Sequence, residues 1–152
     1  MALKTEESRK INLVIVHCSD SPDTMDIGLP EIEKWHAERF SGVVVDGHRI
    51  HCGYHYIVRR DGTVEVGRPE SVIGAHCEGY NSRSIGICWV GRKKPGEKQM
   101  AMLLGLVRNV MLRYGMASKQ VRGHKEFNPN KTCPNLDMEL FRRQLSVTTG
   151  MG

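Results

Sequence analysis

One short apolar run limits the fold of this chain more than any other feature of its sequence. Residues 11–16 are nearly all apolar and rich in branched side chains, and His17 follows them directly. A run of this length and composition is typical of a strand that is buried on both faces of its sheet. Such a strand needs covering layers on both sides. The sequence therefore predicts helices packed on a sheet, with His17 at the carboxyl end of a central strand.

Strand and helix patterns alternate along the rest of the chain. The clearest helix covers residues 97–114, whose apolar side chains follow the 3.6-residue period, and Gly115 stands where a C-cap belongs. Pro30 suits the first turn of an earlier helix, and Asp137 suits the N-cap of a last helix that runs through Leu145. The remaining expectations are strands at 85–90 and near Val121, a hairpin joining 54–59 to 63–66 through Asp61-Gly62, and a long loop or irregular hairpin at 41–51.

The chain has the size and composition of one globular domain. It has 152 residues, of which 39% are hydrophobic and 26% charged, and neither repeats nor a linker divide it. We expect an α/β fold, which some schemes would class as α+β, with a central mixed sheet flanked by helices. The domain is expected to span residues 11–145, with an N-terminal extension at 1–10 and a C-terminal tail at 146–152.

Composition and charge exclude some functions and favour others. No window of 18 apolar residues exists, so no membrane span is expected, and the polar first ten residues hold no secretion signal. We therefore expect the chain to remain in the cytoplasm as synthesised, with its five cysteines reduced. The net charge of +5 favours acidic partners. The basic residues are scattered, however, and no nucleic-acid motif is present, so no nucleic acid is expected as a partner.

Two histidines and a cysteine form a candidate metal site. His17 ends the buried strand pattern, and His124 and Cys133 lie close together near the other end of the chain, within reach of one loop. Two imidazoles and a thiolate leave the fourth tetrahedral position of zinc open to water, which suits a hydrolytic site. Each residue taken alone is more typical of a core or edge position. Spacing alone therefore supports zinc and structural roles about equally.

Two other arrangements compete with this site. His48, His51 and Cys52 are close in sequence, but glycines border the segment and it lacks a helical period, so an exposed loop is the better interpretation. Alternatively, Cys133 would be a nucleophile with His124 as its base. Pro134 argues against this version, because a reactive cysteine commonly stands at a helix start where backbone N–H groups lower its pKa.

A series of short motifs occurs in a familiar order. It comprises His17-Cys18-Ser19, Gly53-Tyr54-His55-Tyr56, Arg60-Asp61-Gly62-Thr63-Val64, Gly67-Arg68-Pro69, Gly74-Ala75-His76, Gly79-Tyr80-Asn81-Ser82, Ser84-Ile85-Gly86-Ile87 and Lys131-Thr132-Cys133-Pro134. The series resembles the type-2 N-acetylmuramoyl-L-alanine amidases. It is most similar to their phage lysozyme branch, with peptidoglycan recognition proteins as more distant kin. The resemblance covers roughly residues 11 to 145.

The resemblance implies a fold, a cofactor and roles for particular residues. It implies a peptidoglycan recognition protein/phage lysozyme-like fold and one Zn²⁺ per chain, held by His17, His124 and Cys133. Tyr54 and Lys131 match the family's catalytic tyrosine and lysine. The residues that fall in substrate-groove motifs are Trp35, His36, His76 and Asn81; for Trp35 a place in the core is equally supported.

The implied activity is zinc-dependent hydrolysis of the amide bond between N-acetylmuramic acid and L-alanine in peptidoglycan. The chain would then act as a monomer on the cell wall after its release. The main alternative is a non-catalytic peptidoglycan-binding module, and a protein regulator built on the same fold is a further one. The sequence also departs from the phage branch, because the stretch between His36 and Tyr54 is longer by residues 43–51. The extra histidines and cysteine there, His48, His51 and Cys52, would form a lid or a partner contact.

Overall fold

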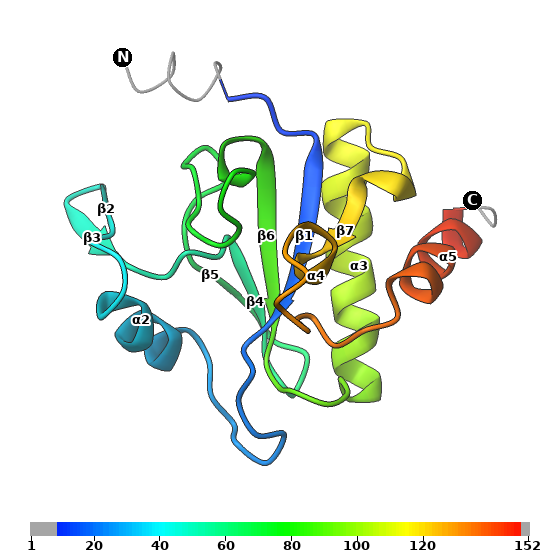
Figure 1. The fold of residues 1–152 in the computed structure, drawn as a ribbon, viewed down its shortest axis with the longest axis horizontal. Coiled ribbons are helices and arrows are strands. Elements are labelled where there is room, and N and C mark those ends of the chain that lie inside the picture. The colour runs from blue at the N-terminus through cyan, green and yellow to red at the C-terminus, as the bar shows by residue number, and fades with distance from the viewer. Residues whose placement is uncertain (1–8, 150–152) are drawn as a thin grey trace.

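A mixed five-stranded sheet forms the centre of the molecule in the computed structural model, which describes residues 9–149 (Figure 1). The strand order is β5-β4-β6-β1-β7. Strand β1 lies between β6 and β7 and is parallel to both, β4 is parallel to β6, and β5 is antiparallel to β4. The predicted mixed sheet is therefore confirmed. The strands are β1 (Leu13–Cys18), β4 (Tyr56–Val58), β5 (Val64–Val66), β6 (Ser84–Trp89) and β7 (Val121–Gly123).

Every residue of β1 is buried, as the apolar run predicts. Val14 and Val16 belong to the main core on one face of the sheet, whereas Leu13 and Ile15 belong to a smaller cluster on the other face. Side chains alternate along a strand, so His17 follows Leu13 and Ile15 onto this second face. The strand thus carries one histidine to the face that lies opposite the main core.

Helix α3 (Glu97–Tyr114) covers the main-core face, and its bounds match the prediction (Figure 1). It ends at Gly115, whose left-handed conformation with φ of 65° lets its N–H bond to the carbonyl of Met111. A residue with a side chain would be strained there, which explains the glycine. Among the described residues, no helix combines the length and the apolar character that a membrane span requires.

Helix α5 (Met138–Thr149) packs beside α3. Asp137 acts as its predicted N-cap, because its carboxylate Oδ1 accepts the N–H of Leu140 at 3.1 Å. The helix extends to Thr149, so the prediction that it ends at Leu145 is wrong. Within the two predicted end segments, residues 1–8 and 150–152 lie outside the described part of the chain.

The second face of the sheet carries shorter elements. Helix α2 (Leu29–Ala37) lies at one side, with Pro30 in its first turn as predicted, and the short helix α4 (His124–Phe127) lies at the other. The described residues also include two single turns of 3-10 helix: η1 (Asn81–Arg83), which contacts β6, and η2 (Ser118–Gln120), which contacts α5. Phe127 of α4 stacks on Tyr80 with ring centroids 4.0 Å apart, which fixes α4 against the loop before η1.

A separate hairpin projects beyond α2 (Figure 1). Its strands are β2 (Val43–Val45) and β3 (His48–Ile50), which pair with each other and with no strand of the central sheet. This is the irregular hairpin expected at 41–51. Glu33 of α2 ties its base, because the carboxylate accepts the backbone N–H groups of His51 and Cys52 at 2.7 and 2.8 Å.

Candidate active site

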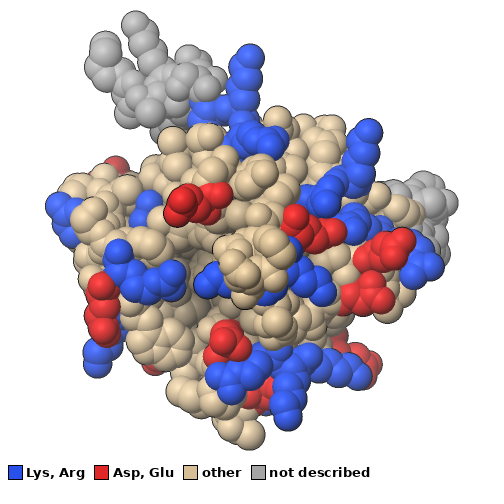
Figure 2. All heavy atoms as spheres, in the orientation of Figure 1, with Lys and Arg blue, Asp and Glu red and all other residues tan. Residues whose placement is uncertain are grey.

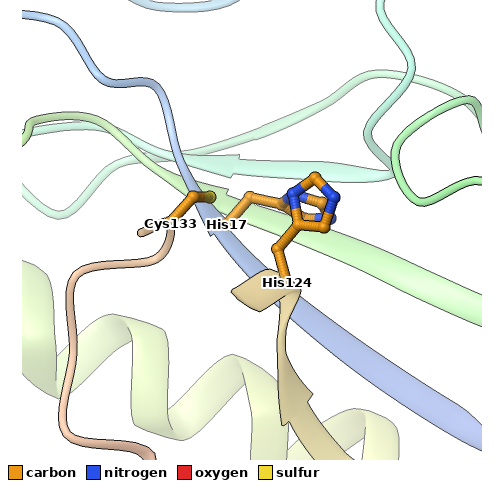
Figure 3. Close-up of side chains that lie close together, drawn as sticks. All are labelled: His17, His124 and Cys133. Atoms are coloured by element: carbon orange, nitrogen blue, oxygen red, sulfur yellow. The ribbon is translucent and has the colours of Figure 1, made fainter. Parts of the chain in front are cut away.

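His17, His124 and Cys133 converge on one point on the second face of the sheet (Figure 3). His17 comes from β1, His124 is the first residue of α4 directly after β7, and Cys133 comes from the loop between α4 and α5. Their ligand atoms all lie within 4.8 Å of one another. Within residues 9–149, no other group of His, Cys, Asp or Glu side chains meets that criterion for a metal. The structure therefore brings the three predicted ligands together.

Hydrogen bonds from three directions fix the segment that carries Cys133. The backbone N–H of Cys18 donates to the Cys133 sulfur, with 3.0 Å between N and Sγ. The N–H of Lys125 donates to the Cys133 carbonyl at 2.8 Å, which joins the two ligand-bearing segments of the loop. The indole of Trp89, fully buried in β6, donates to the carbonyl of Pro134 at 2.9 Å. The thiol position is thus set by the sheet as well as by its own loop.

The two imidazoles are in the protonation state that zinc binding needs, whereas the Cys133 thiol has to lose its proton to bind the metal. Burial, together with the neighbouring His76, His124 and His36, holds the pKa of His17 well below its usual range. Burial and the charge of Lys131 lower the pKa of His124. Both imidazoles are therefore neutral near pH 7 and able to bind a cation. The Cys18 side chain and burial raise the pKa of the Cys133 thiol, so a divalent ion is needed to hold it as a thiolate.

Tyr54 lies beside the ligand cluster. Its ring centroid is 5.0 Å from that of His17 and 5.2 Å from that of His36. Burial, and then the surrounding cysteines Cys88 and Cys133, raise the pKa of Tyr54 well above its usual value. The hydroxyl therefore keeps its proton at neutral pH and can donate a hydrogen bond there.

Lys131 lies at the mouth of the site. It is exposed and lines the same cleft as the three ligands. Its backbone N–H bonds to the Asn128 carbonyl at 2.9 Å, which closes the turn before Cys133. Its ammonium group makes no hydrogen bond or ion pair to any side chain that the structure describes, so the charge is available to a ligand in the cleft.

The four predicted groove residues fall in different places. His36 is buried and lines the cleft, where its Nδ1 accepts the N–H of Gly53 at 2.8 Å, and burial with the nearby Arg39 charge lowers its pKa to about 4. Asn81 also lines the cleft, but its Oδ1 accepts two backbone N–H groups of the chain itself. Trp35 is 38% exposed and lies outside the lining of the cleft and outside the core.

His76 is the fourth of these residues, and it contacts a ligand. Its Nδ1 lies 2.8 Å from Nε2 of His17, and its Nε2 lies 3.2 Å from the Ser84 hydroxyl. Although His76 lines the cleft, both ring nitrogens are used inside the protein. It can therefore offer a substrate the edge of its ring but no free nitrogen.

The cleft around the ligands has a volume of about 670 Å³. Figure 2 shows this face hollowed near its centre, with Lys and Arg side chains on both sides of the hollow. The lining includes residues that sequence analysis missed, among them Arg39 and Phe40, which follow α2, and Asp20 and Glu78. The Arg39 guanidinium lies over the Phe40 ring at 5.1 Å from its centroid. No motif marks these residues, so the fold alone brings them to the cleft.

The two competing arrangements find no support in the geometry. His48 is exposed on β3, His51 bonds Glu33 through Nδ1 at 2.6 Å, and burial raises the pKa of the Cys52 thiol to about 11. They form no metal group among the described residues. Cys133 as a nucleophile would need a lowered pKa, whereas its surroundings raise it.

A family model and several known proteins match most of this chain. The family model described as N-acetylmuramoyl-L-alanine amidase matches residues 7–136. The endolysin of Klebsiella phage KP32 is 37% identical over 144 residues, covering 90% of this chain and 88% of that protein. The endolysin of Escherichia phage T7 is 34% identical over 152 residues, covering 95% and 93%.

Solved structures show the same fold. The N-acetylmuramoyl-L-alanine amidase LysC from Clostridium intestinale superposes with a TM-score of 0.75 at 27% identity, covering 90% of this chain and 86% of that one. The wild-type Drosophila peptidoglycan recognition protein LB superposes with a TM-score of 0.66 at 24% identity, covering 82% and 75%. The predicted peptidoglycan recognition protein/phage lysozyme-like fold is thus confirmed.

Proposed function

The chain belongs to the N-acetylmuramoyl-L-alanine amidase family and is an amidase, and from this premise we propose that it is a zinc enzyme of peptidoglycan hydrolysis. The observation that carries the proposal is the convergence of His17, His124 and Cys133, whose ligand atoms lie within 4.8 Å of one another in the cleft. The bond cleaved joins N-acetylmuramic acid to L-alanine. One ion per chain suffices.

The residues present fit zinc. Two neutral imidazoles and one thiolate leave a net charge near +1 and one coordination position free of protein ligands. When bound, zinc supplies Lewis-acid chemistry, which polarises a carbonyl and lowers the pKa of a water. The site contains no histidine pair separated by one helical turn, so the three ligands depend on β1, β7 and the Cys133 loop for their relative positions.

Tyr54 and Lys131 are the catalytic residues of the proposal. The Tyr54 hydroxyl holds its proton and donates a hydrogen bond to the carbonyl oxygen as negative charge develops there. The Lys131 ammonium group faces the same cleft from its exposed rim and stabilises that charge from a second direction. A preorganised donor at such a position is typically worth about 3 kcal/mol in the transition state.

The substrate would lie along the cleft between α2 and α4. Among the groove residues inferred from the sequence, His36, His76 and Asn81 line that cleft, so they would shape its floor. Trp35 would contact only a substrate that extends past the cleft. The cations Arg39 and Lys131 suit the free carboxylates of peptidoglycan peptides, and the net charge of +5 aids encounter with an anionic wall. We place the action on the cell wall after release of the protein.

The rival function is a non-catalytic peptidoglycan-binding module. Such a module would tolerate the loss of a metal ligand or a catalytic side chain. Here the three ligands, Tyr54 and Lys131 all face one cleft, which favours the enzyme.

The test is mass spectrometry of purified peptidoglycan after incubation with the protein, with and without a zinc chelator. We expect release of peptides that begin with a free L-alanine amine, loss of this release on chelation and recovery on adding zinc. The Cys133→Ser protein serves as the control for contaminating hydrolases. Binding of the protein to peptidoglycan without any release would support the binding module instead.

A further inference from the structure

A hydrogen bond between two histidines lies directly behind the candidate metal site. Nε2 of His17 and Nδ1 of His76 are 2.8 Å apart, and the two rings meet edge to face with centroids 4.9 Å apart. His17 is only 1% exposed, so little of its ring is open to solvent. With Nε2 engaged in this way, Nδ1 is the His17 nitrogen left for a metal.

The arrangement requires one particular set of protons. If Nδ1 of His17 is the ligand atom, its Nε2 carries the proton and donates it to Nδ1 of His76. Nδ1 of His76 must then be bare, so the proton of the neutral His76 ring lies on Nε2, which donates to the Ser84 hydroxyl at 3.2 Å. Each of the two ring N–H groups in the series thus meets an acceptor.

The protein holds His76 firmly in this orientation. The backbone N–H groups of His76 and Cys77 both donate to Oδ1 of Asn81, at 2.9 and 2.8 Å, which fixes the loop. The ring lies flat on β6 at Gly86, where an added Cβ would come within 2.6–2.7 Å of three ring atoms. Any side chain at Gly86 would displace the ring, which explains a glycine inside a buried strand.

We propose that His76 is a positioning residue, which accepts the Nε2–H of His17 and so presents Nδ1 of His17 to the metal; this rests on the zinc site proposed above. Partners of metal-bound histidines are commonly carboxylates or carbonyls, and they fix the tautomer and the ring orientation. A neutral imidazole does the same without adding charge. The site therefore keeps the net charge near +1 that zinc has when two neutral imidazoles and one thiolate bind it.

The experiment measures metal binding rather than hydrolysis. Zinc affinity is determined by competition with a chromophoric chelator, and the visible spectrum of the Co²⁺-substituted protein reports the ligand geometry. The variants are His76→Ala, which removes the acceptor, and His76→Asn, whose Oδ1 can stand close to the place of Nδ1. His48→Ala, on the exposed hairpin, is the matched control for replacing a histidine by alanine.

We expect His76→Ala to weaken zinc affinity by about 10–100-fold and to change the Co²⁺ spectrum. His76→Asn should recover most of the affinity, and His48→Ala should match the unchanged protein. If His76→Ala does not fold, Ser84→Ala tests the same series of hydrogen bonds, and we expect it to weaken zinc affinity by several-fold.

The inference would be overturned if the folded His76→Ala protein had the zinc affinity and the Co²⁺ spectrum of the unchanged protein. The same result in Ser84→Ala would overturn it where that variant replaces His76→Ala. Absence of zinc binding by the unchanged protein would overturn the zinc site itself, and the inference with it.

Discussion

The backbone N–H of Cys18 donates a hydrogen bond to the sulfur of Cys133, across 3.0 Å. This contact joins the end of the central strand β1 to the loop before α5, two segments that lie far apart in the sequence. Cys18 is also the neighbour of His17, so one short stretch of β1 supplies one proposed ligand and contacts another. A thiolate that accepts a backbone N–H is stabilised without any added charge. The candidate metal site is therefore held by the sheet as well as by the loop that carries Cys133.

Replacing this sulfur should remove the metal. In Cys133→Ser, a hydroxyl takes the place of the thiol, and a hydroxyl is a much weaker zinc ligand because it does not ionise near neutral pH. We expect loss of bound zinc and of hydrolysis, with the fold retained. Cys77→Ala, which alters a buried cysteine outside the ligand group, should keep its zinc. Metal analysis after dialysis measures both, and full zinc occupancy in Cys133→Ser would show that the ligand assignment is wrong.

Tyr54→Phe should separate metal binding from catalysis. The change removes only the hydroxyl, whose raised pKa makes it a donor at neutral pH, and leaves the ring contact with His17 in place. We expect kcat to fall by about 10²–10³-fold, the usual effect of losing one oxyanion donor, while zinc content and KM change little. Steady-state kinetics on soluble peptidoglycan fragments give the two constants. An unchanged kcat would remove Tyr54 from the mechanism.

Lys131→Ala should also reduce kcat. The change removes the ammonium group at the rim of the cleft, which would stabilise the negative charge that develops on the carbonyl oxygen. Lys125 provides a close control, since it lies on the neighbouring helix α4, is exposed, and does not line the cleft. We expect Lys125→Ala to keep nearly full activity and Lys131→Ala to lose it severely with zinc still bound. Equal effects of the two substitutions would point to general charge attraction rather than to a specific role of Lys131.

Local patterns were sufficient to predict most of the fold. The 3.6-residue period and Gly115 predict α3 correctly because helix bounds depend on nearby residues. The hairpin formed by β4 and β5 follows from Asp61-Gly62 in the same way. The prediction ends α5 too early, at Leu145, because the residues at 146–149 are serine, valine and two threonines, which favour helices only weakly. The glycine that follows Thr149 in the sequence is the stop signal that agrees with the observed end.

The site was only partly predictable. The sequence could name the three side chains that the structure brings together, because two histidines and a cysteine stand in motifs whose order resembles that of a known family. The contact of His76 with His17 depends on how β1 and β6 are aligned, with His17 opposite Cys88 and Ile15 opposite Gly86, and pairing over that separation has no local signal. Arg39 and Phe40 were missed for a similar reason, since the packing of α2 against the sheet decides which residues after it face the cleft.

Away from the cleft, a carboxylate ties helix α3 to the edge of the sheet. Both Glu70 oxygens accept hydrogen bonds from Arg113, at 2.6 and 2.8 Å, and the hydroxyls of Tyr56 and Tyr114 also donate to this carboxylate. Burial on its own would raise the pKa of Glu70, but these hydrogen bonds and the Arg113 charge lower it to about 2. The carboxylate is thus more stable when ionised in the folded protein than in the unfolded chain.

The lowered pKa of Glu70 makes a prediction about stability in acid. Its contribution should be fully present above the ordinary pKa of 4.5 and should be lost as the pH falls from there to about 2. A shift of this size corresponds to about 3 kcal/mol at neutral pH. We expect Glu70→Gln to lower the free energy of unfolding of the zinc-free protein at pH 7 by up to that amount, because a neutral amide pairs poorly with Arg113.

The difference in the free energy of unfolding between the two proteins should shrink towards zero as the pH falls from 4.5 to 2. Urea unfolding over this range measures it, with Glu38→Gln on the exposed end of α2 as the control. A difference that stays constant with pH would show that Glu70 stabilises the fold by packing rather than by its charge.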